Sequence, residues 1–143
     1  MYYVNQDQIN QRLEFMDWLV GTIPESLENK LESESVIQFL AQERILHLAL
    51  ESVTDIGSYL IDGFLMRDAS SYEDIIEILH GEKVFPSHLL EPLLNLVKMR
   101  KKLVQEYFHL DRNDVHPLLF ELPNVLSEFS ISILNYLKHE LNT

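Results

Sequence analysis

The residues best suited to chemistry form a short basic segment in the second half of the chain. Four cations fall within five residues there: Lys98, Arg100, Lys101 and Lys102. Such a cluster can neutralise phosphate groups and so bind a nucleic acid or a nucleotide. It is also typical of a solvated helical face that balances nearby glutamates, and composition alone favours that second interpretation.

A second candidate site consists of two carboxylates, Glu51 and Asp55, which lie four residues apart in a segment with helical periodicity. Residues at this spacing share one face of a helix, so the pair could bind a ligand or serve acid–base chemistry. A solvated face, or a polar seam at a subunit contact, explains the same spacing without chemistry. The non-catalytic interpretations of this pair are the stronger ones.

The sequence predicts neither a metal site nor a cofactor. A di-iron bundle needs two Glu-x-x-His pairs on two helices, and only Glu77 and His80 have that spacing. No glycine-rich phosphate loop is present, so the chain should not hydrolyse nucleoside triphosphates by that route. Without cysteine, disulfides and thiolate metal sites are excluded.

The composition is that of a globular chain, which we expect to form a single domain over residues 1–143. The net charge of −12 opposes broad nonspecific binding to nucleic acid, so any such contact needs a local basic patch. We see no secretory signal and no apolar run long enough to span a membrane. The expected location is therefore cytoplasmic, with no membrane partner.

The elements that position these residues are predicted to be helices, because apolar residues recur at intervals of three and four almost throughout. We expect an all-α fold, an antiparallel bundle of four main helices plus one short helix. Gly21 and Pro24 should end the first helix, and Pro123 should bend or break the last. The predicted helices cover residues 5–22, 35–65, a short helix capped by Ser71 and closed by Gly81, 87–108, and a last helix from 113 or 114.

The basic segment resembles the motif of HepT-like proteins of the HEPN superfamily. That motif is an arginine, usually followed by asparagine, then valine or isoleucine, histidine, any residue and tyrosine. Arg100, Val104 and Tyr107 match it in register, whereas Lys101 replaces the asparagine and Gln105 replaces the histidine. The segments 43–56 and 71–79 resemble the long second helix and the short helix of the same family. The resemblance therefore covers most of the chain from about residue 35 onward.

The resemblance implies an HEPN-like homodimer of toxin–antitoxin type, whose two motif helices face each other across a cleft. In active members this cleft is a metal-independent ribonuclease that acts on RNA. The arginine holds the phosphate, and the histidine transfers protons as the RNA 2′-hydroxyl attacks. If the motif is α-helical, positions 100 and 105 are about 7.5 Å apart along the helix and roughly 140° apart around it.

Gln105 sets this chain apart from the active pattern, because an amide can orient a group but cannot shuttle a proton near neutral pH. Loss of a positioned general acid or base typically costs about 10²–10⁴ in rate. His109 is a candidate substitute, since it lies one helical turn beyond Gln105 if the helix continues. The candidate catalytic residues are thus Arg100, Gln105 and Tyr107, with Lys101 and Lys102 as binding residues.

Tyr107 has a second implied role, because HepT-like toxins are often silenced by a nucleotidyltransferase antitoxin that attaches AMP to this tyrosine. The simpler interpretation is a tyrosine that packs at the dimer seam. Three hypotheses follow for the chain. In the first, it is an RNA- or nucleotide-binding homodimer with weak or absent ribonuclease activity. In the second, it is an active ribonuclease that uses His109 or water. In the third, it is a non-enzymatic partner of a nucleotidyltransferase.

Overall fold

Five α-helices account for most of the chain, as its three- and four-residue apolar spacing predicts. The computed structural model describes residues 2–28, 35–110 and 116–141, and no strand occurs among them. The predicted all-α fold is therefore confirmed. The helices are α1 (Gln6–Ser26), α2 (Ser35–Gly63), α3 (Tyr72–Gly81), α4 (Leu90–Lys98) and α5 (Leu118–Leu141), joined by the short turns η2 (Ser87–Leu89), η3 (Lys101–Gln105) and η4 (Tyr107–His109).

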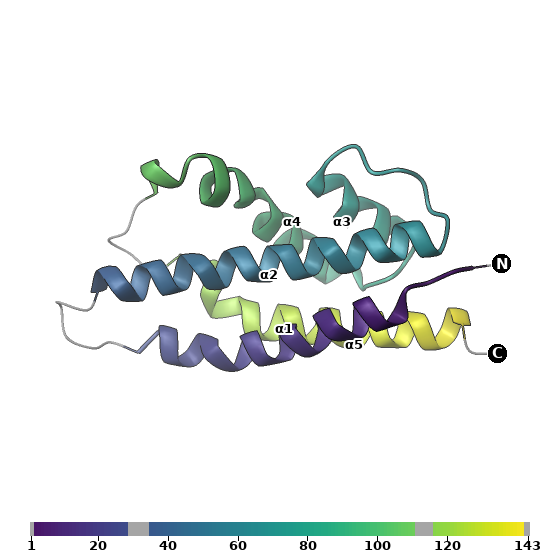
Figure 1. Ribbon diagram of the computed structural model, residues 1–143, viewed down its shortest axis with the longest axis horizontal. Helices are drawn as coiled ribbons and strands as arrows, with labels where there is room; N and C mark the ends of the chain where they lie inside the picture. Colours follow the sequence, from purple (N-terminus) through teal and green to yellow (C-terminus); the bar gives the residue numbers. More distant parts are fainter. Residues whose placement is uncertain (1, 29–34, 111–115, 142–143) are drawn as a thin grey trace.

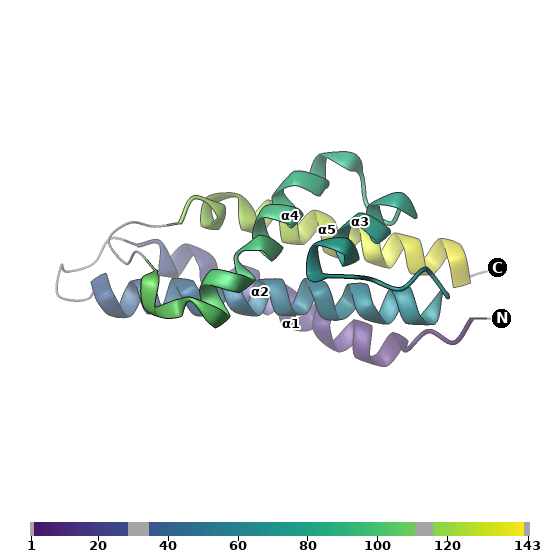
Figure 2. The same cartoon turned by 90° about the horizontal axis from the view of Figure 1, so that it is seen from above.

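The three long helices lie side by side along the molecule, and the two short ones cover α2 (Figure 1). α1 runs antiparallel to both α2 and α5, so the described parts near the two termini lie at the same end (Figure 1). Seen from above, the segment after α4 runs toward the end of the molecule where α2 begins (Figure 2). This topology places residues 100–109 far from the termini.

A continuous apolar core joins all five helices. Ile9 and Met16 of α1, Leu60 of α2, Leu93 of α4 and Phe129 of α5 are fully buried in it. Each helix buries one stripe and exposes the other, which is the pattern that stabilises an amphipathic helix in a bundle. The packing of α3 on α2 is especially close.

The contact between α2 and α3 depends on Gly57. A Cβ atom built at this position would lie 2.4 Å from Cγ2 of Ile75. Such a distance is far below van der Waals contact, so any larger side chain would push α3 away from α2. The glycine therefore allows α3 to lie close against α2.

α1 does not end at its predicted stop signals and α5 is not broken at Pro123, because packing outweighs a local stop signal. A bend at Pro123 stays a prediction. α1 continues past Gly21 and Pro24 to Ser26, and it buries Ile23 in its last turns. α5 continues through Pro123, with Leu122 and Val125 buried on either side of it. Proline removes one backbone hydrogen bond, and the burial of neighbouring apolar side chains compensates for that loss here. The predicted start of α5 at residue 113 or 114 lies outside the described residues.

The end of α3 at Gly81 is confirmed, although another residue forms the left-handed turn after the helix. Gly81 is still helical, and the left-handed residue beyond the helix is Lys83, with a φ of 60°. The amide of Val84 donates to the carbonyl of Leu79 at 2.9 Å, which closes the turn around Lys83. A lysine thus occupies a conformation that glycine usually takes.

The start of α3 is held by a cap and a bidentate ion pair. The Ser71 hydroxyl accepts the amide hydrogen of Asp74 at 3.0 Å, which confirms the predicted cap. Both guanidinium Nη atoms of Arg67 donate to the Asp74 carboxylate at 2.7 Å. These two bonds lower the pKa of the Asp74 carboxyl most, and the hydrogen bond from the Ser70 amide lowers it further. The pKa of this carboxyl therefore lies well below its usual range.

This depressed pKa predicts an acid-sensitive contribution to stability. The contribution is complete above the ordinary aspartate pKa of about 3.9. It declines below that pH because the unfolded chain then binds a proton that the ion-paired native carboxylate does not, and it is lost as the pH falls through the lower pKa of the folded state. Urea unfolding followed by circular dichroism between pH 7 and pH 3 should therefore show a steeper decline for the native protein than for Asp74→Asn. Parallel declines for the two proteins would rule out this role of Asp74.

Candidate functional site

The basic segment does not form the continuous helix that its sequence predicts. α4 ends at Lys98, and residues Lys101–Gln105 form one wide π-helical turn. The amide of Glu106 donates to the carbonyl of Lys101, five residues back, at 2.9 Å. The side chains of the same two residues form a salt bridge, with Nζ and the carboxylate oxygen 3.8 Å apart.

The wide turn changes the relation between Arg100 and Gln105. In a π-helix, hydrogen bonds join residues five apart, so such residues are separated by about one turn. Arg100 and Gln105 therefore lie on the same side of the segment. The predicted angular separation of an α-helix is wrong for this reason.

Arg100 is held by an aromatic ring. Its guanidinium carbon lies 4.2 Å from the centroid of the Tyr72 ring, and its Nε atom is buried without a hydrogen-bond partner. No carboxylate among the described residues forms a salt bridge with it. By contrast, Arg12 and Arg67 pair with Asp55 and Asp74. The charge of Arg100 is thus not neutralised by a carboxylate among the described residues.

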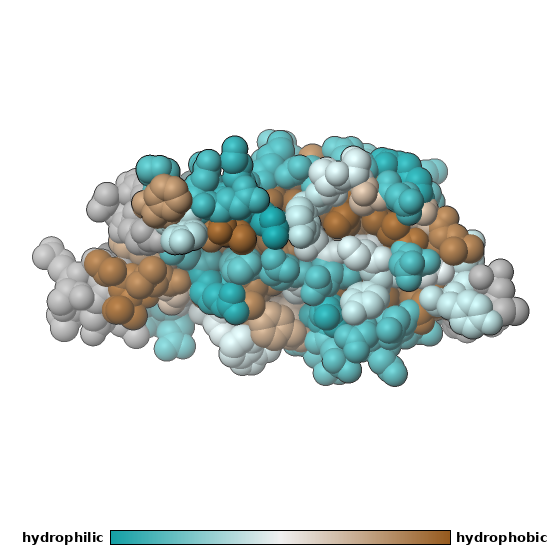
Figure 3. Space-filling model, turned by 45° about the horizontal axis from the view of Figure 1, so that its top comes forward, coloured by the Kyte–Doolittle hydropathy of each residue, from teal (hydrophilic) through white to brown (hydrophobic). Residues whose placement is uncertain are grey.

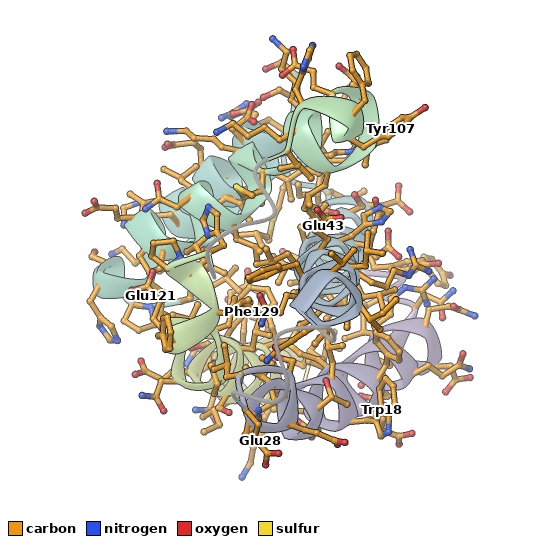
Figure 4. All side chains as sticks on the ribbon, turned by 90° about the vertical axis from the view of Figure 1, so that its left-hand side faces the viewer. Trp18, Glu28, Glu43, Tyr107, Glu121 and Phe129 are labelled. Carbon is orange, nitrogen blue, oxygen red and sulfur yellow. The ribbon has the colours of Figure 1, made fainter. Side chains whose placement is uncertain are left out.

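The neighbouring candidate residues face solvent. Gln105, Lys101 and Lys102 are exposed, and so are Tyr107 at 57% and Phe108 at 66%. The two aromatic rings meet edge to face, with centroids 5.7 Å apart. Figure 4 shows Tyr107 pointing outward, away from the core around Phe129. Cations and exposed rings on one segment form a surface that suits an anionic, aromatic ligand such as a nucleotide.

A cavity of about 370 Å³ lies on the other side of this segment, against α2. Arg100, Gln105 and Tyr107 are absent from its walls, whereas Lys102 and His109 are among them. The expectation for His109 assumed a continuous helix. Instead it lies on the separate turn η4, at the cavity. The remaining lining residues are Phe39, Gln42, Glu43, Leu46, Met99, Leu103, Glu106, Leu110, His116 and Pro117.

His116 shares this cavity and is a residue that the motif comparison misses. Its Nδ1 atom accepts the amide hydrogen of Leu118 at 3.2 Å, at the start of α5. Burial lowers the pKa of His116, and nearby Lys102 lowers it further. The imidazole is therefore biased toward its neutral form with the proton on Nε2. With Nδ1 engaged by the backbone, His116 is poorly placed to act as a base.

The carboxylate pair on α2 has local partners. Asp55 accepts a hydrogen bond from Nε of Arg12 on α1 at 3.1 Å, and Glu51 lies 3.3 Å from Nε2 of His47. Neither lines the cavity beside the basic segment. The α2 carboxylate that points toward that segment is Glu43, as Figure 4 shows. A binding role for Glu51 and Asp55 stays a prediction.

Across residues 2–28, 35–110 and 116–141, no cluster of three histidine, aspartate or glutamate side chains is arranged to hold a metal ion. Within the same ranges, none of the helices combines the length and the apolar character that crossing a bilayer requires.

Comparison with known protein families identifies the chain. Residues 12–133 match the family described as Ribonuclease HepT-like. The chain belongs to the HepT-like ribonuclease family. A curated relative from Bacillus subtilis (strain 168), named Putative RNase YutE, is 36% identical over 141 residues, which is 99% of this chain and 95% of the relative. The family resemblance drawn from the motif is confirmed.

The structure of a HepT-like relative supports the same assignment. This relative was solved as the cytosolic protein of unknown function YutE from Bacillus subtilis. It superposes with a TM-score of 0.87 at 35% sequence identity, over 100% of this chain and 97% of the other. The agreement covers the whole chain, so the arrangement of the five helices around the motif segment is that of the HepT-like fold.

Proposed function

We propose that the chain is an RNA-binding HepT-like homodimer in which ribonuclease activity is weak or absent. The observation that carries this proposal is Arg100, a half-buried arginine that is held by a ring and salt-bridged to no described carboxylate. A cation in this state attracts a phosphate strongly. Lys101 and Lys102 add charge beside it, so the acidic chain gains a local basic patch.

The chemistry at this site would be independent of metal ions. Arg100 would hold the phosphate and stabilise the charge that develops on it. Gln105, on the same side of the π-helical turn, occupies the position that the family motif gives to histidine. Its amide can orient the phosphate or the 2′-hydroxyl but cannot accept and return a proton. Binding is therefore expected to persist while cleavage is slow.

The homodimer is supported by apolar surface at the same end of the molecule. Val36, Ile37 and Leu40, near the start of α2, are exposed. Figure 3 shows this apolar surface at the end of the molecule where α2 begins, the end that the segment after α4 also approaches. Exposed apolar clusters of this kind mark protein contacts. A twofold contact there would bring two copies of the basic segment together.

The RNA-binding claim predicts a specific loss in Arg100→Ala. We expect affinity for a labelled single-stranded RNA, measured by fluorescence anisotropy in chelator, to fall by about tenfold or more, because a charge-assisted phosphate contact is removed. The salt dependence should also weaken by about one phosphate contact. Lys138→Ala, an exposed cation on α5, is the matched control and should bind normally. Equal binding by both variants would refute the assignment of Arg100.

The proposed homodimer predicts that Ile37→Glu lowers the molecular mass of the protein in solution. We expect light scattering at micromolar concentration to report a dimer for the native protein and a monomer for this variant, because a buried unpaired charge opposes association. Trp18→Glu changes a similarly exposed residue on α1 and should leave the dimer intact. A monomeric native protein, or dissociation only in Trp18→Glu, would contradict this interface.

A second function is favoured by the exposure of Tyr107. Its hydroxyl lies on the turn after the basic segment, where a nucleotidyltransferase could reach it to attach AMP. The chain would then be the partner of such an antitoxin in a toxin–antitoxin pair. We propose a cytoplasmic location for both functions, in line with the cytosolic relative. Incubation with a partner enzyme and ATP, followed by mass spectrometry, would show the adduct on Tyr107.

A further inference from the structure

Tyr72 lies at the start of α3, 28 residues before Arg100 in the sequence and outside the family motif. The residue is 40% exposed, and the guanidinium carbon of Arg100 lies 4.2 Å from the centroid of its ring. A distance this short is well inside the range of about 6 Å over which a ring face attracts a cation. The contact joins α3 to the segment that follows α4.

The backbone that carries Tyr72 is held by its surroundings. Ser71 caps the helix directly before it, and Arg67 and the Ser70 amide both bond to Asp74 two residues after it. This network anchors the backbone on both sides of Tyr72. α3 also packs on α2 and on α4, so the backbone that carries the ring is held in place beside the segment of Arg100.

We propose that Tyr72 is a positioning residue that holds Arg100 ready for an RNA phosphate. This inference rests on the proposed function. A ring face attracts the guanidinium but does not neutralise it as a carboxylate does. Tyr72 thus restrains a long, flexible side chain while its positive charge stays available. The side chain of Arg100 therefore loses its conformational entropy before the phosphate binds, and this preorganisation strengthens binding.

The ring and not the hydroxyl performs this role. Among the described residues, the hydroxyl of Tyr72 forms no hydrogen bond, whereas its ring contacts Arg100. Phenylalanine should therefore replace tyrosine at this position without loss. Leucine has similar bulk and apolar character but lacks the ring quadrupole, so it should release Arg100.

RNA affinity in chelator tests the proposal with four variants. Tyr72→Leu should bind about threefold to tenfold more weakly than the native protein, and Tyr72→Phe should bind equally well. In an Arg100→Ala background, Tyr72→Leu should cause no further loss, because the two residues act as one unit. Tyr3→Leu, an exposed tyrosine near the N-terminus, is the control and should bind normally.

Two outcomes would overturn the role of Tyr72. One is native affinity in Tyr72→Leu. The other is a loss in Tyr72→Leu that persists in the Arg100→Ala background, since the ring would then act independently of Arg100. Circular dichroism of each variant checks that the helical fold is intact.

A readout without RNA separates this inference from the proposed function. The ring should shift the NMR signals of the Arg100 Cδ protons, and the shift should vanish in Tyr72→Leu and persist in Tyr72→Phe. Failure of the native protein to bind RNA would contradict the proposed function. The NMR comparison would still decide whether Tyr72 holds Arg100, and an unshifted native signal would refute that contact.

Discussion

Gln105→His is expected to raise the rate of RNA cleavage in chelator by about 10²–10⁴, the range that a positioned general acid or base supplies. The reason is local. The π-helical turn places position 105 on the same side as Arg100, and the Gln105 side chain is exposed. An imidazole there can take the proton of the 2′-hydroxyl while Arg100 holds the phosphate. Single-turnover cleavage of a labelled RNA measures the gain.

Two control variants make this gain interpretable. Lys138→His adds an imidazole to exposed surface on α5, outside the basic segment, and should leave the rate unchanged. Adding Arg100→Ala to Gln105→His should remove the gained activity, because the phosphate is no longer held. A folded Gln105→His protein that cleaves no faster than the native one would mean that the π-helical turn does not form a ribonuclease site. Fast cleavage by the native protein would instead establish the active ribonuclease hypothesis.

Phe129→Ala is expected to lower the free energy of unfolding by about 3–5 kcal/mol, the usual cost of truncating a buried phenylalanine. Phe129 is fully buried on α5, and its ring lies 6.3 Å from that of Phe85. Figure 4 places it between the helices, in the interior of the bundle. Alanine would leave a cavity that the surrounding helices can fill only in part. Urea unfolding followed by circular dichroism gives the value.

Phe120→Ala is the matched control for this loss. Phe120 lies on the same helix but is 67% exposed, so its truncation should change stability by less than about 0.5 kcal/mol. Equal effects of the two variants would show that the core is not organised around Phe129. The comparison therefore tests the packing of α5 separately from its helix propensity.

The fold was predictable because its local signals agree with its packing. Residues such as Leu13, Met16 and Leu60 recur at helical spacing, and burial of that stripe forms the bundle. Ser71 stands three residues before Asp74, and this spacing correctly indicates the start of α3. The motif residues Arg100, Val104 and Tyr107 indicated the family. For these features, the controlling interactions span only a few residues.

The remaining features depend on contacts that no local pattern contains. The π-helical turn could not be predicted from the apolar pattern, because Leu103 and Val104 are both half-buried. An α-helix and a π-helix would each cover an apolar side chain at these positions. Pro24 and Pro123 stay inside helices because tertiary burial outweighs one lost hydrogen bond. The contact of Tyr72 with Arg100 joins distant segments and could only be seen in three dimensions.

The most direct test of the central claim, that residues 100–108 bind RNA, is ultraviolet crosslinking of a uridine-containing RNA to the native protein. Tryptic digestion and mass spectrometry then locate the adduct. We predict an adduct on the peptide 103–112, which carries the exposed rings of Tyr107 and Phe108. Arg100→Ala should reduce its yield. Adducts confined to Tyr2, Tyr3 or Trp18, with the peptide 103–112 unmodified, would contradict the claim.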